Sequence, residues 1–145
     1  MRVRSALFLA SLTLVLLAAD QAQDDEIKKE LDKLQGSWLI QSWEQDGKAD
    51  ESHKAAKVVF AGDTFTRQSP KETVKGKVKL DPKAKPKTID TTYTEGPNKD
   101  KTILAIMEMK GERIVVCYND GGKERPKEFA TTANSGLVLI RYKKQ

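Results

Sequence analysis

The sequence predicts an all-β domain, namely a small antiparallel up-and-down barrel of about eight strands with a short N-terminal helix. Two observations predict this fold class. After Gly36, stretches rich in strand-forming residues alternate with turn signals at roughly ten-residue spacing. Several of these stretches also alternate apolar and polar side chains, as strands with one buried face do. The length of 145 residues fits a single domain.

The N-terminus has the layout of a secretory signal peptide. A short basic start precedes an almost wholly apolar segment, residues 5–19, and small residues follow it. The apolar segment has about fifteen residues, fewer than the roughly 20 that a membrane-spanning helix needs. We expect residues 1–22 to be a signal peptide cleaved after position 19 or 22, with retention as an anchor as the alternative. The mature chain is then secreted or periplasmic and has no membrane span.

Cysteine usage supports an extracytoplasmic bacterial location. Cys117 is the only cysteine, so no intramolecular disulfide can form. An exported domain without disulfides is more typical of a bacterial envelope than of a small eukaryotic secreted protein. Because Cys117 lies in the apolar run Ile-Val-Val-Cys-Tyr, we expect a buried structural thiol and not a nucleophile.

The charge pattern argues against nucleic-acid binding. The formal net charge is +5, but lysines are interleaved with acidic residues and aromatic residues are few. A nucleic-acid binder typically has a clustered basic face with stacking aromatics. We expect a solvated surface of mixed charge and a monomer.

Residues 23–34 are predicted to form the N-terminal helix. Ile27, Leu31 and Leu34 recur at spacings of four and three, which places them on one helical face. Gly36 is a natural stop. A helix of about ten residues is marginal alone, so this face must pack against the rest of the domain.

Residues 35–145 are predicted to form the barrel domain. The stretch 74–80 alternates most clearly, with apolar residues on one face and Lys75, Lys77 and Lys79 on the other. Stretches 102–109 and 112–118 are apolar on both faces, so we expect them to lie centrally or under the helix. The remaining predicted strands are 37–44, 57–61, 64–68, 88–94, a weak edge strand at 126–131, and 136–143.

The residue types that support catalysis or metal binding are scarce. His53 is the only histidine and lies in a polar loop, where an ordinary surface histidine is expected. No nucleophile motif accompanies it, and no glycine-rich loop opens a helix. We therefore assign no catalytic, cofactor or metal residues, and the sequence gives no positive indication of an enzyme.

Two carboxylates and one arginine are the remaining polar candidates. Asp81 and Asp90 flank a proline-bearing stretch and could pair, although turn capping is the commoner role of such aspartates. Arg125 precedes a proline, which favours an extended backbone. Its guanidinium could clamp Asp90 or bind an anionic ligand, and we favour the structural clamp between Asp90 and Arg125.

Six spaced motifs carry a family resemblance that covers residues 34–143. The chain resembles an uncharacterised lipocalin-like domain family abundant in Planctomycetes, which has no established activity or substrate. At Ala105-Ile106-Met107 it departs from the family, whose members usually have a glycine followed by Ile-Tyr. The motifs are LQGSW (34–38), GDTFT (62–66), LDPKAKPKTID (80–90), ILAIMEMKGERIVVCY (103–118), ERPKEF (124–129) and LIRYKK (139–144).

The wider lipocalin resemblance rests on Gly36-x-Trp38 and on Arg141 in the last strand. It implies that Trp38 closes one end of the barrel, that Arg141 packs across its ring, and that Gly36 allows the turn from helix to strand. These three residues are the expected barrel closure.

The resemblance implies a binding domain that takes a small apolar or amphipathic molecule into a calyx-like barrel. An eight-stranded barrel can hold one small ligand or be filled by side chains. The alternative is a non-catalytic envelope domain that contacts an anionic polymer or a protein partner. Its surface would include Lys75, Lys77, Lys79 and the lysines of 83–87.

Overall fold

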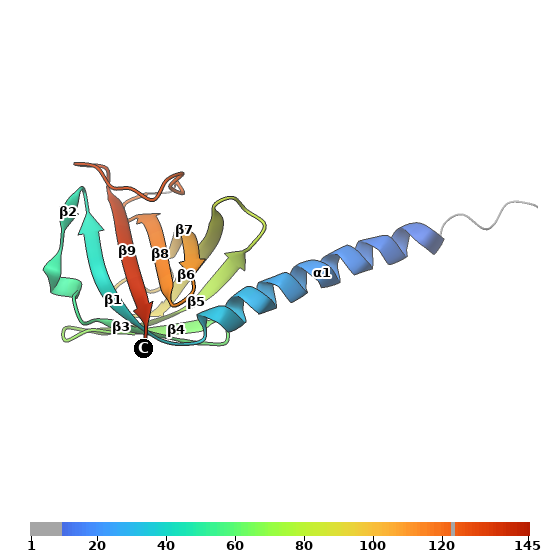
Figure 1. Cartoon of the computed structure of the whole chain (residues 1–145), viewed down its shortest axis with the longest axis horizontal. Helices are drawn as coiled ribbons and strands as arrows, with labels where there is room; N and C mark the ends of the chain where they lie inside the picture. Colours follow the sequence, from blue (N-terminus) through green and yellow to red (C-terminus); the bar gives the residue numbers. More distant parts are fainter. Residues whose placement is uncertain (1–9, 123) are drawn as a thin grey trace, which may run out of the picture.

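The structure is a computed structural model that describes residues 10–122 and 124–145, and it contains a closed antiparallel barrel preceded by one long helix (Figure 1). The predicted fold class is confirmed. Nine strands form one sheet in the order β2-β1-β3-β4-β5-β6-β7-β8-β9, and pairing of β1 with β9 closes it. The wall has eight strands, because β2 is a short addition beside β1. The elements are α1 (Ala10–Leu34), β1 (Gly36–Gln45), β2 (Lys48–Ala49), the 3₁₀ turn η1 (Glu51–His53), β3 (Lys57–Ala61), β4 (Thr64–Gln68), β5 (Thr73–Asp81), β6 (Lys87–Glu95), β7 (Thr102–Lys110), β8 (Arg113–Asn119) and β9 (Leu137–Lys144).

Strand β5 has the alternation that the sequence predicts. Its exposed and buried residues alternate along all of its length, and its lysines lie on the exposed face. Gly76 lies on the buried face, where the Phe65 ring of β4 packs across it. A Cβ at position 76 would lie 2.5 Å from Phe65 Cε1, so only glycine fits beneath this ring.

A bulge in β1 determines which side chains of the first strand enter the barrel. Ile40 is paired with Tyr142 and Ser42 with Arg141, so Gln41 is an extra residue on the β1 side. Past the bulge the alternation is shifted by one residue. Trp43 therefore points inward with Trp38 and Ile40, despite its odd spacing from both.

The junction between α1 and β1 closes one end of the barrel. Trp38 is fully buried, and its indole Nε1 donates a hydrogen bond to the carbonyl oxygen of Leu34 at 2.7 Å. That carbonyl lies in the last turn of α1, where no helical partner is available. Gly36 has a φ of 103°, a conformation that favours glycine and turns the chain from helix to strand.

Arg141 does not take part in this closure, and that part of the expectation is wrong. Arg141 is exposed on the outer side of β9, opposite Ser42 and Val115. Lys144, three residues further along the same strand, pairs with Trp38 and places its Nζ 5.3 Å from the indole ring centroid. Since side chains alternate along a strand, position 144 shares the inward face with 142 whereas position 141 does not.

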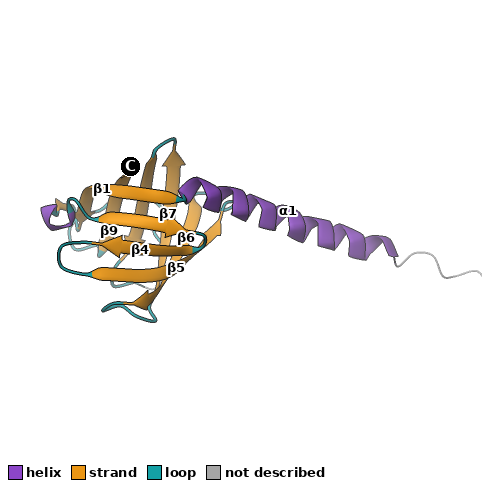
Figure 2. Ribbon diagram, turned by 90° about the horizontal axis from the view of Figure 1, so that it is seen from below, coloured by secondary structure: helices purple, strands orange, loops and turns teal. Residues whose placement is uncertain are grey.

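Helix α1 is longer than the predicted 23–34 and begins at Ala10, within the segment predicted as a signal peptide. Residues 1–9 of that prediction lie outside the described residues. The C-terminal turns of α1 meet the barrel, where Leu34 is buried and Leu31 packs against the core, and the N-terminal part extends away from it (Figure 2). Within the described part of the chain, no helix combines the length and apolar character needed to cross a bilayer.

An irregular segment, residues 124–136, covers the outer face of β7, β8 and β9, and we call it the strap. The predicted edge strand at 126–131 is therefore wrong. Phe129 packs against an outer cluster of Ile106, Cys117 and Leu139, and the Cys117 Sγ lies 3.7 Å from the carbonyl oxygen of Ala130. Strands β7 and β8 are apolar on both faces because the strap, and not the helix, covers their outer side.

A buried carboxylate ties α1 to the barrel. Glu30 is 6% exposed, and its oxygens lie 2.6 Å from Lys33 Nζ and 3.0 Å from Lys87 Nζ of β6. Burial alone raises the pKa of this carboxyl, but hydrogen bonds and charge from Lys33 and Lys87 outweigh that effect and lower it.

We expect Trp38→Ala to lower the free energy of unfolding by roughly 3–5 kcal/mol, because it removes a large buried side chain and leaves a cavity. Urea unfolding at neutral pH measures the loss. Trp38→Phe, which keeps an aromatic ring but lacks the donor to Leu34, should fall between the wild type and Trp38→Ala. A loss below about 1 kcal/mol for Trp38→Ala would contradict the closure described above.

Glu30→Gln should lower the stability at pH 7 by about 1–2 kcal/mol, because it removes a charge that Lys33 and Lys87 share. Since the folded-state pKa is lowered, the stabilisation by Glu30 is present above the unfolded-state pKa and is lost as the pH falls through the folded value. Wild-type stability should thus decline below about pH 4.5 more steeply than that of Glu30→Gln. Urea unfolding between pH 7 and pH 4 measures this, with the exposed Glu26→Gln as control. Equal slopes for Glu30→Gln and wild type would refute the coupling.

Candidate functional site

The barrel interior contains a small cavity of about 80 Å³. Leu34 bounds it at the closed end, and inward side chains of β3 to β9 form its walls. Most of these side chains are aliphatic or aromatic, among them Val78, Ile89, Ala105 and Ile114. Much of the interior is therefore filled by side chains, and the remaining space suits an apolar group.

Five polar side chains also line this cavity. They are Arg67 of β4, Thr91 of β6 and the three tyrosines of the chain, Tyr93, Tyr118 and Tyr142. Each of these side chains lies on the face of its strand that points into the barrel, because successive residues of a strand alternate between the two faces. Arg67, Tyr93 and Tyr118 lie toward the strand ends opposite Trp38, so the cavity is apolar near its closed end and polar near the other end, which we call the mouth.

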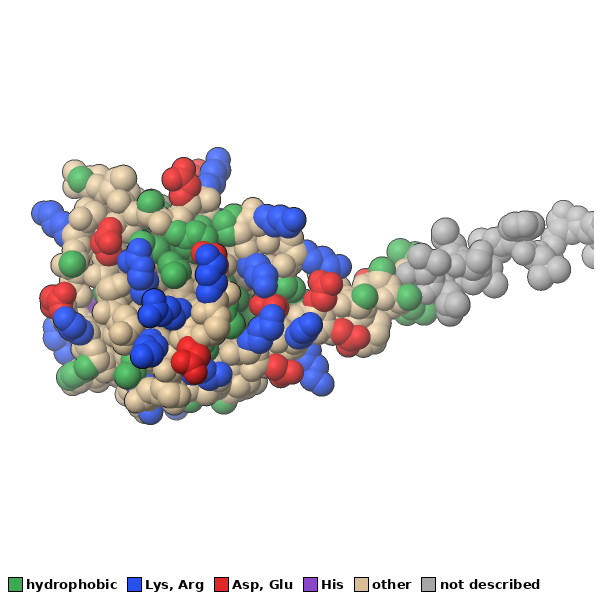
Figure 3. All heavy atoms as spheres, in the orientation of Figure 1, with side chains coloured by type: hydrophobic (Ala, Val, Ile, Leu, Met, Phe, Trp, Pro, Cys, Tyr) green, Lys and Arg blue, Asp and Glu red, His purple; other side chains and the backbone are tan. Residues whose placement is uncertain are grey.

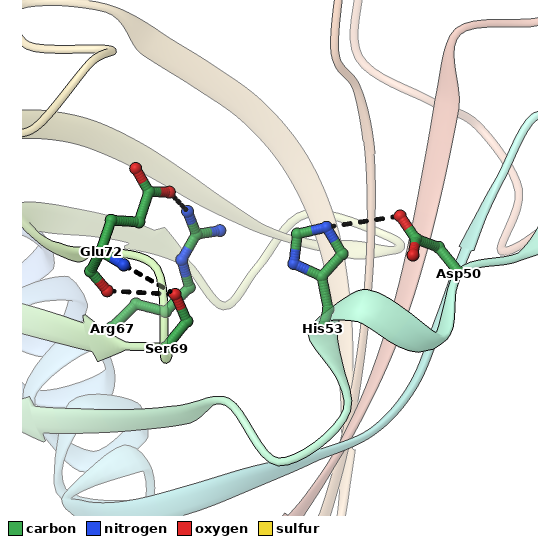
Figure 4. A network of polar contacts seen from close by, with 5 residues as sticks. All are labelled: Asp50, His53, Arg67, Ser69 and Glu72. Atoms are coloured by element: carbon green, nitrogen blue, oxygen red, sulfur yellow. Dashed lines mark hydrogen bonds and ion pairs between the residues drawn. The ribbon is translucent and has the colours of Figure 1, made fainter.

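The Arg67 guanidinium is largely withdrawn from solvent. Its side chain is 16% exposed, and its Nη2 lies 3.1 Å from Glu72 Oε1 (Figure 4). A turn formed by Ser69 and Glu72 places this carboxylate, because Ser69 Oγ accepts from the Glu72 amide and donates to its carbonyl oxygen. The Arg67 Cζ also lies 6.0 Å from the Trp43 ring centroid, at the outer limit of a cation–π contact.

The tyrosine hydroxyls are kept protonated by their surroundings. Burial raises the pKa of Tyr93, Tyr118 and Tyr142, and the charge of Arg67 opposes that rise at each of them. Over residues 10–122 and 124–145, no hydrogen bond joins any of these hydroxyls to another side chain or to the backbone. Each hydroxyl can therefore donate to or accept from a molecule in the cavity.

A stacked aromatic pair lies beside Arg67 and Tyr118, outside the residues that line the cavity. The His53 imidazole lies on the Trp43 indole with a centroid separation of 3.9 Å and an interplanar angle of 19°. Asp50 caps the η1 turn by accepting from the Ser52 amide, and its Oδ2 lies 3.5 Å from His53 Nε2 (Figure 4). His53 is thus a positioned, half-buried side chain and not the ordinary surface histidine that the sequence predicts.

Trp43 connects the stacked pair to the cavity polar groups. It is 6% exposed, and its ring meets Tyr118 edge-on at a centroid separation of 6.4 Å. Its indole Nε1 is buried and has no hydrogen-bond partner among the described residues. Such an unpaired buried donor is unusual in a folded protein.

The structure places the other predicted residues away from this site. Gly36 and Trp38 are at the closed end. Asp90 and Arg125 form the expected clamp on the outer wall, where Arg125 Nη1 lies 2.6 Å from Asp90 Oδ1 and donates to the Ala105 carbonyl oxygen at 2.7 Å. Asp81 instead caps a turn by accepting from the Lys83 and Ala84 amides, so the two aspartates do not pair.

The other reactive side chains form no centre in the described residues. Cys117 is buried under the strap, and burial raises the pKa of its thiol. No group of three or more histidine, cysteine, aspartate or glutamate side chains that could hold a metal ion occurs in residues 10–122 and 124–145. The side chains at the mouth can donate hydrogen bonds to a bound molecule. Arg67 also places a positive charge there.

Comparisons of the chain with protein-family models, with curated proteins and with solved structures find no match. The barrel interior is therefore the feature of the chain that bears on function.

Sequence reasoning missed Arg67 and Trp43. Arg67 could have been placed inside from its spacing of two residues from Phe65, which is buried. Trp43 could not, because strict alternation from Trp38 points it outward and only the bulge reverses this.

Burial lowers the pKa of His53 below its ordinary value of about 6.5. The negative charges of Asp50 and Glu72 oppose this lowering of the pKa. The positive charges of Arg67 and Lys71 add to it. The neutral imidazole is therefore favoured in the folded state. The contribution of His53 to stability is present above the unfolded-state pKa and is lost as the pH falls through the folded value.

We expect a proton NMR titration of the His53 ring to give a pKa below about 6.5 in the wild type. In Trp43→Leu the pKa should move up, because removal of the stacked indole exposes the imidazole to water. The same titration in Trp38→Phe, at the far end of the barrel, serves as a control and should match the wild type. A wild-type pKa above 6.5 would contradict the desolvated stack.

Proposed function

We propose that the protein is an exported lipocalin-like binding domain that takes a small apolar or amphipathic molecule into its barrel. The observation that carries the proposal is the interior cavity, which has apolar walls and, toward one end, the Arg67 guanidinium and tyrosine hydroxyls that no protein group pairs. This combination is typical of small-molecule sites, in which a few polar groups orient an otherwise apolar ligand. Export is supported by the signal-like N-terminal sequence.

The size of the cavity limits the part of the ligand that it can enclose. Its volume of about 80 Å³ is roughly half of the 150 Å³ of an apolar cavity that accepts benzene. A ligand that fits without rearrangement therefore buries only a few carbon atoms. A longer molecule would extend through the mouth, past His53 and Arg67.

An envelope domain that contacts an anionic polymer is the second candidate, and the lysines on the outer face of β5 are the observation behind it. Their surroundings make this surface less cationic than the sequence suggests. Lys75 Nζ lies 3.4 Å from Glu95. Acidic side chains are also interspersed with basic ones on the face drawn in Figure 3. Small-molecule binding is therefore the better supported proposal.

We expect titration with 1-butanol, and equilibration with xenon, to shift the methyl NMR signals of Ala105 and Ile114 in a saturable manner. Both residues line the cavity, whereas Val115 packs on the outer side of the same wall and serves as the reporter that does not respond. Ala105→Leu replaces a methyl group with an isobutyl group in the cavity and should abolish the Ile114 response. Filling a packed interior in this way costs about 1–3 kcal/mol of stability.

The matched control is Ala61→Leu, which makes the same change at an exposed position of β3 and should bind as the wild type does. The proposal fails if the cavity methyl signals show no saturable response to either probe. It also fails if folded Ala105→Leu responds as strongly as the wild type.

A further inference from the structure

Hydrogen-bond donors predominate among the unpaired polar groups of the mouth. The Arg67 guanidinium carries five N–H donors and no acceptor, and its one ion pair in the described part of the chain uses Nη2 toward Glu72. Trp43, which contacts Tyr118 but does not line the cavity, has a buried indole N–H without a partner. Tyr93 and Tyr118 add hydroxyls without protein partners, which can donate as well as accept, and Tyr142 adds a third hydroxyl nearer the closed end of the cavity.

The acceptors at the mouth face water more than the donors do. The Glu72 side chain is 40% exposed, whereas the Arg67 side chain that it pairs with is 16% exposed. The Asp50 side chain is 40% exposed and is engaged with His53 and Ser52. Asp120, whose charge also raises the pKa of Tyr93 and Tyr118, is exposed as well. Water therefore screens these three carboxylates more than it screens the guanidinium, which favours an anionic group on the cavity side.

We propose that the mouth end of the cavity is a carboxylate-binding subsite in which Arg67 receives the head group of a small amphipathic monoanion. This assignment rests on the proposed binding function and specifies its ligand class. A carboxylate supplies only acceptors, and its two oxygens match the planar fork of a guanidinium. The tyrosine hydroxyls add donors, and the short alkyl part of the ligand occupies the apolar space beside Ala105 and Ile114.

Glu72 competes with the ligand in this arrangement. Its carboxylate already engages one guanidinium nitrogen of Arg67 and repels a second carboxylate at short range. The Ser69–Glu72 turn that holds it lies at the exposed edge of the mouth, outside the residues that line the cavity. Neutralising Glu72 should therefore strengthen binding, while neutralising Arg67 should weaken it.

The test compares butyrate with 1-butanol, which have equal chain length and differ in the charged head group. Dissociation constants follow from the Ala105 and Ile114 methyl signals at constant ionic strength. We expect the wild type to bind butyrate at least about tenfold more tightly than 1-butanol. Arg67→Gln should remove this preference, because the loss of affinity falls mainly on butyrate. Glu72→Gln should raise the affinity for butyrate.

Lys77→Gln is the matched control, because it removes one positive charge from the exposed face of β5 and should keep the wild-type preference. Equal affinities for butyrate and 1-butanol in the wild type would overturn the carboxylate assignment and leave the proposed function standing. Failure of both probes would overturn the function itself. If Arg67→Gln does not fold, Glu72→Gln still tests the role of Arg67. Butyrate binding by Glu72→Gln that is unchanged or weaker than in the wild type would refute that role.

Discussion

The hydrogen bond from Trp38 to the carbonyl oxygen of Leu34 is the contact on which the rest of the structure depends. It joins the end of the helix to the start of the first strand, fills the narrow end of the barrel, and satisfies a carbonyl that the helix leaves unpaired. Gly36 provides the turn that brings the two groups together, and Lys144 of the last strand covers the indole. With this end sealed, any exchange between the cavity and solvent has to occur at the mouth.

The two ends of the barrel use the two tryptophans of the chain in different ways. Trp38 has its N–H satisfied and is fully buried in the main apolar cluster, so it acts as a plug. Trp43 has an unsatisfied N–H and lies among an imidazole, a guanidinium and a phenol. The bulge in β1 makes this difference possible, because it places both rings inside the same wall while separating them along the barrel axis.

Local patterns in the sequence were sufficient to predict the fold. They were not sufficient to predict the polar residues of the candidate site. Alternation around β5 and regular turn signals led to the barrel, and a glycine followed by Trp38 led to its closed end. Arg141 was assigned by resemblance, and the strand parity favours Lys144 instead. The strap was mistaken for an edge strand, since Pro126 to Thr131 contains strand-forming residues whose apolar members pack as a cover.

The polar mouth depends on contacts between segments that are distant in sequence. The stack of His53 on Trp43, and the approach of Arg67 to Tyr118 and Tyr142, result from the closure of the sheet and leave no signature in any single segment. Asp90 and Arg125 were an exception, because an arginine held in an extended backbone before a proline is a specific local signal.

The pairing of β1 with β9 has a consequence for how the chain folds. The contact between Trp38 and Lys144 spans almost the entire domain, so closure has to overcome the entropy of a very large loop. Topologies dominated by such distant pairings fold slowly. Until β9 has been synthesised and docked, β1 presents an unpaired edge with two tryptophans beside it, which is a surface prone to intermolecular pairing. The sealed barrel is therefore most vulnerable to aggregation before its last strand arrives.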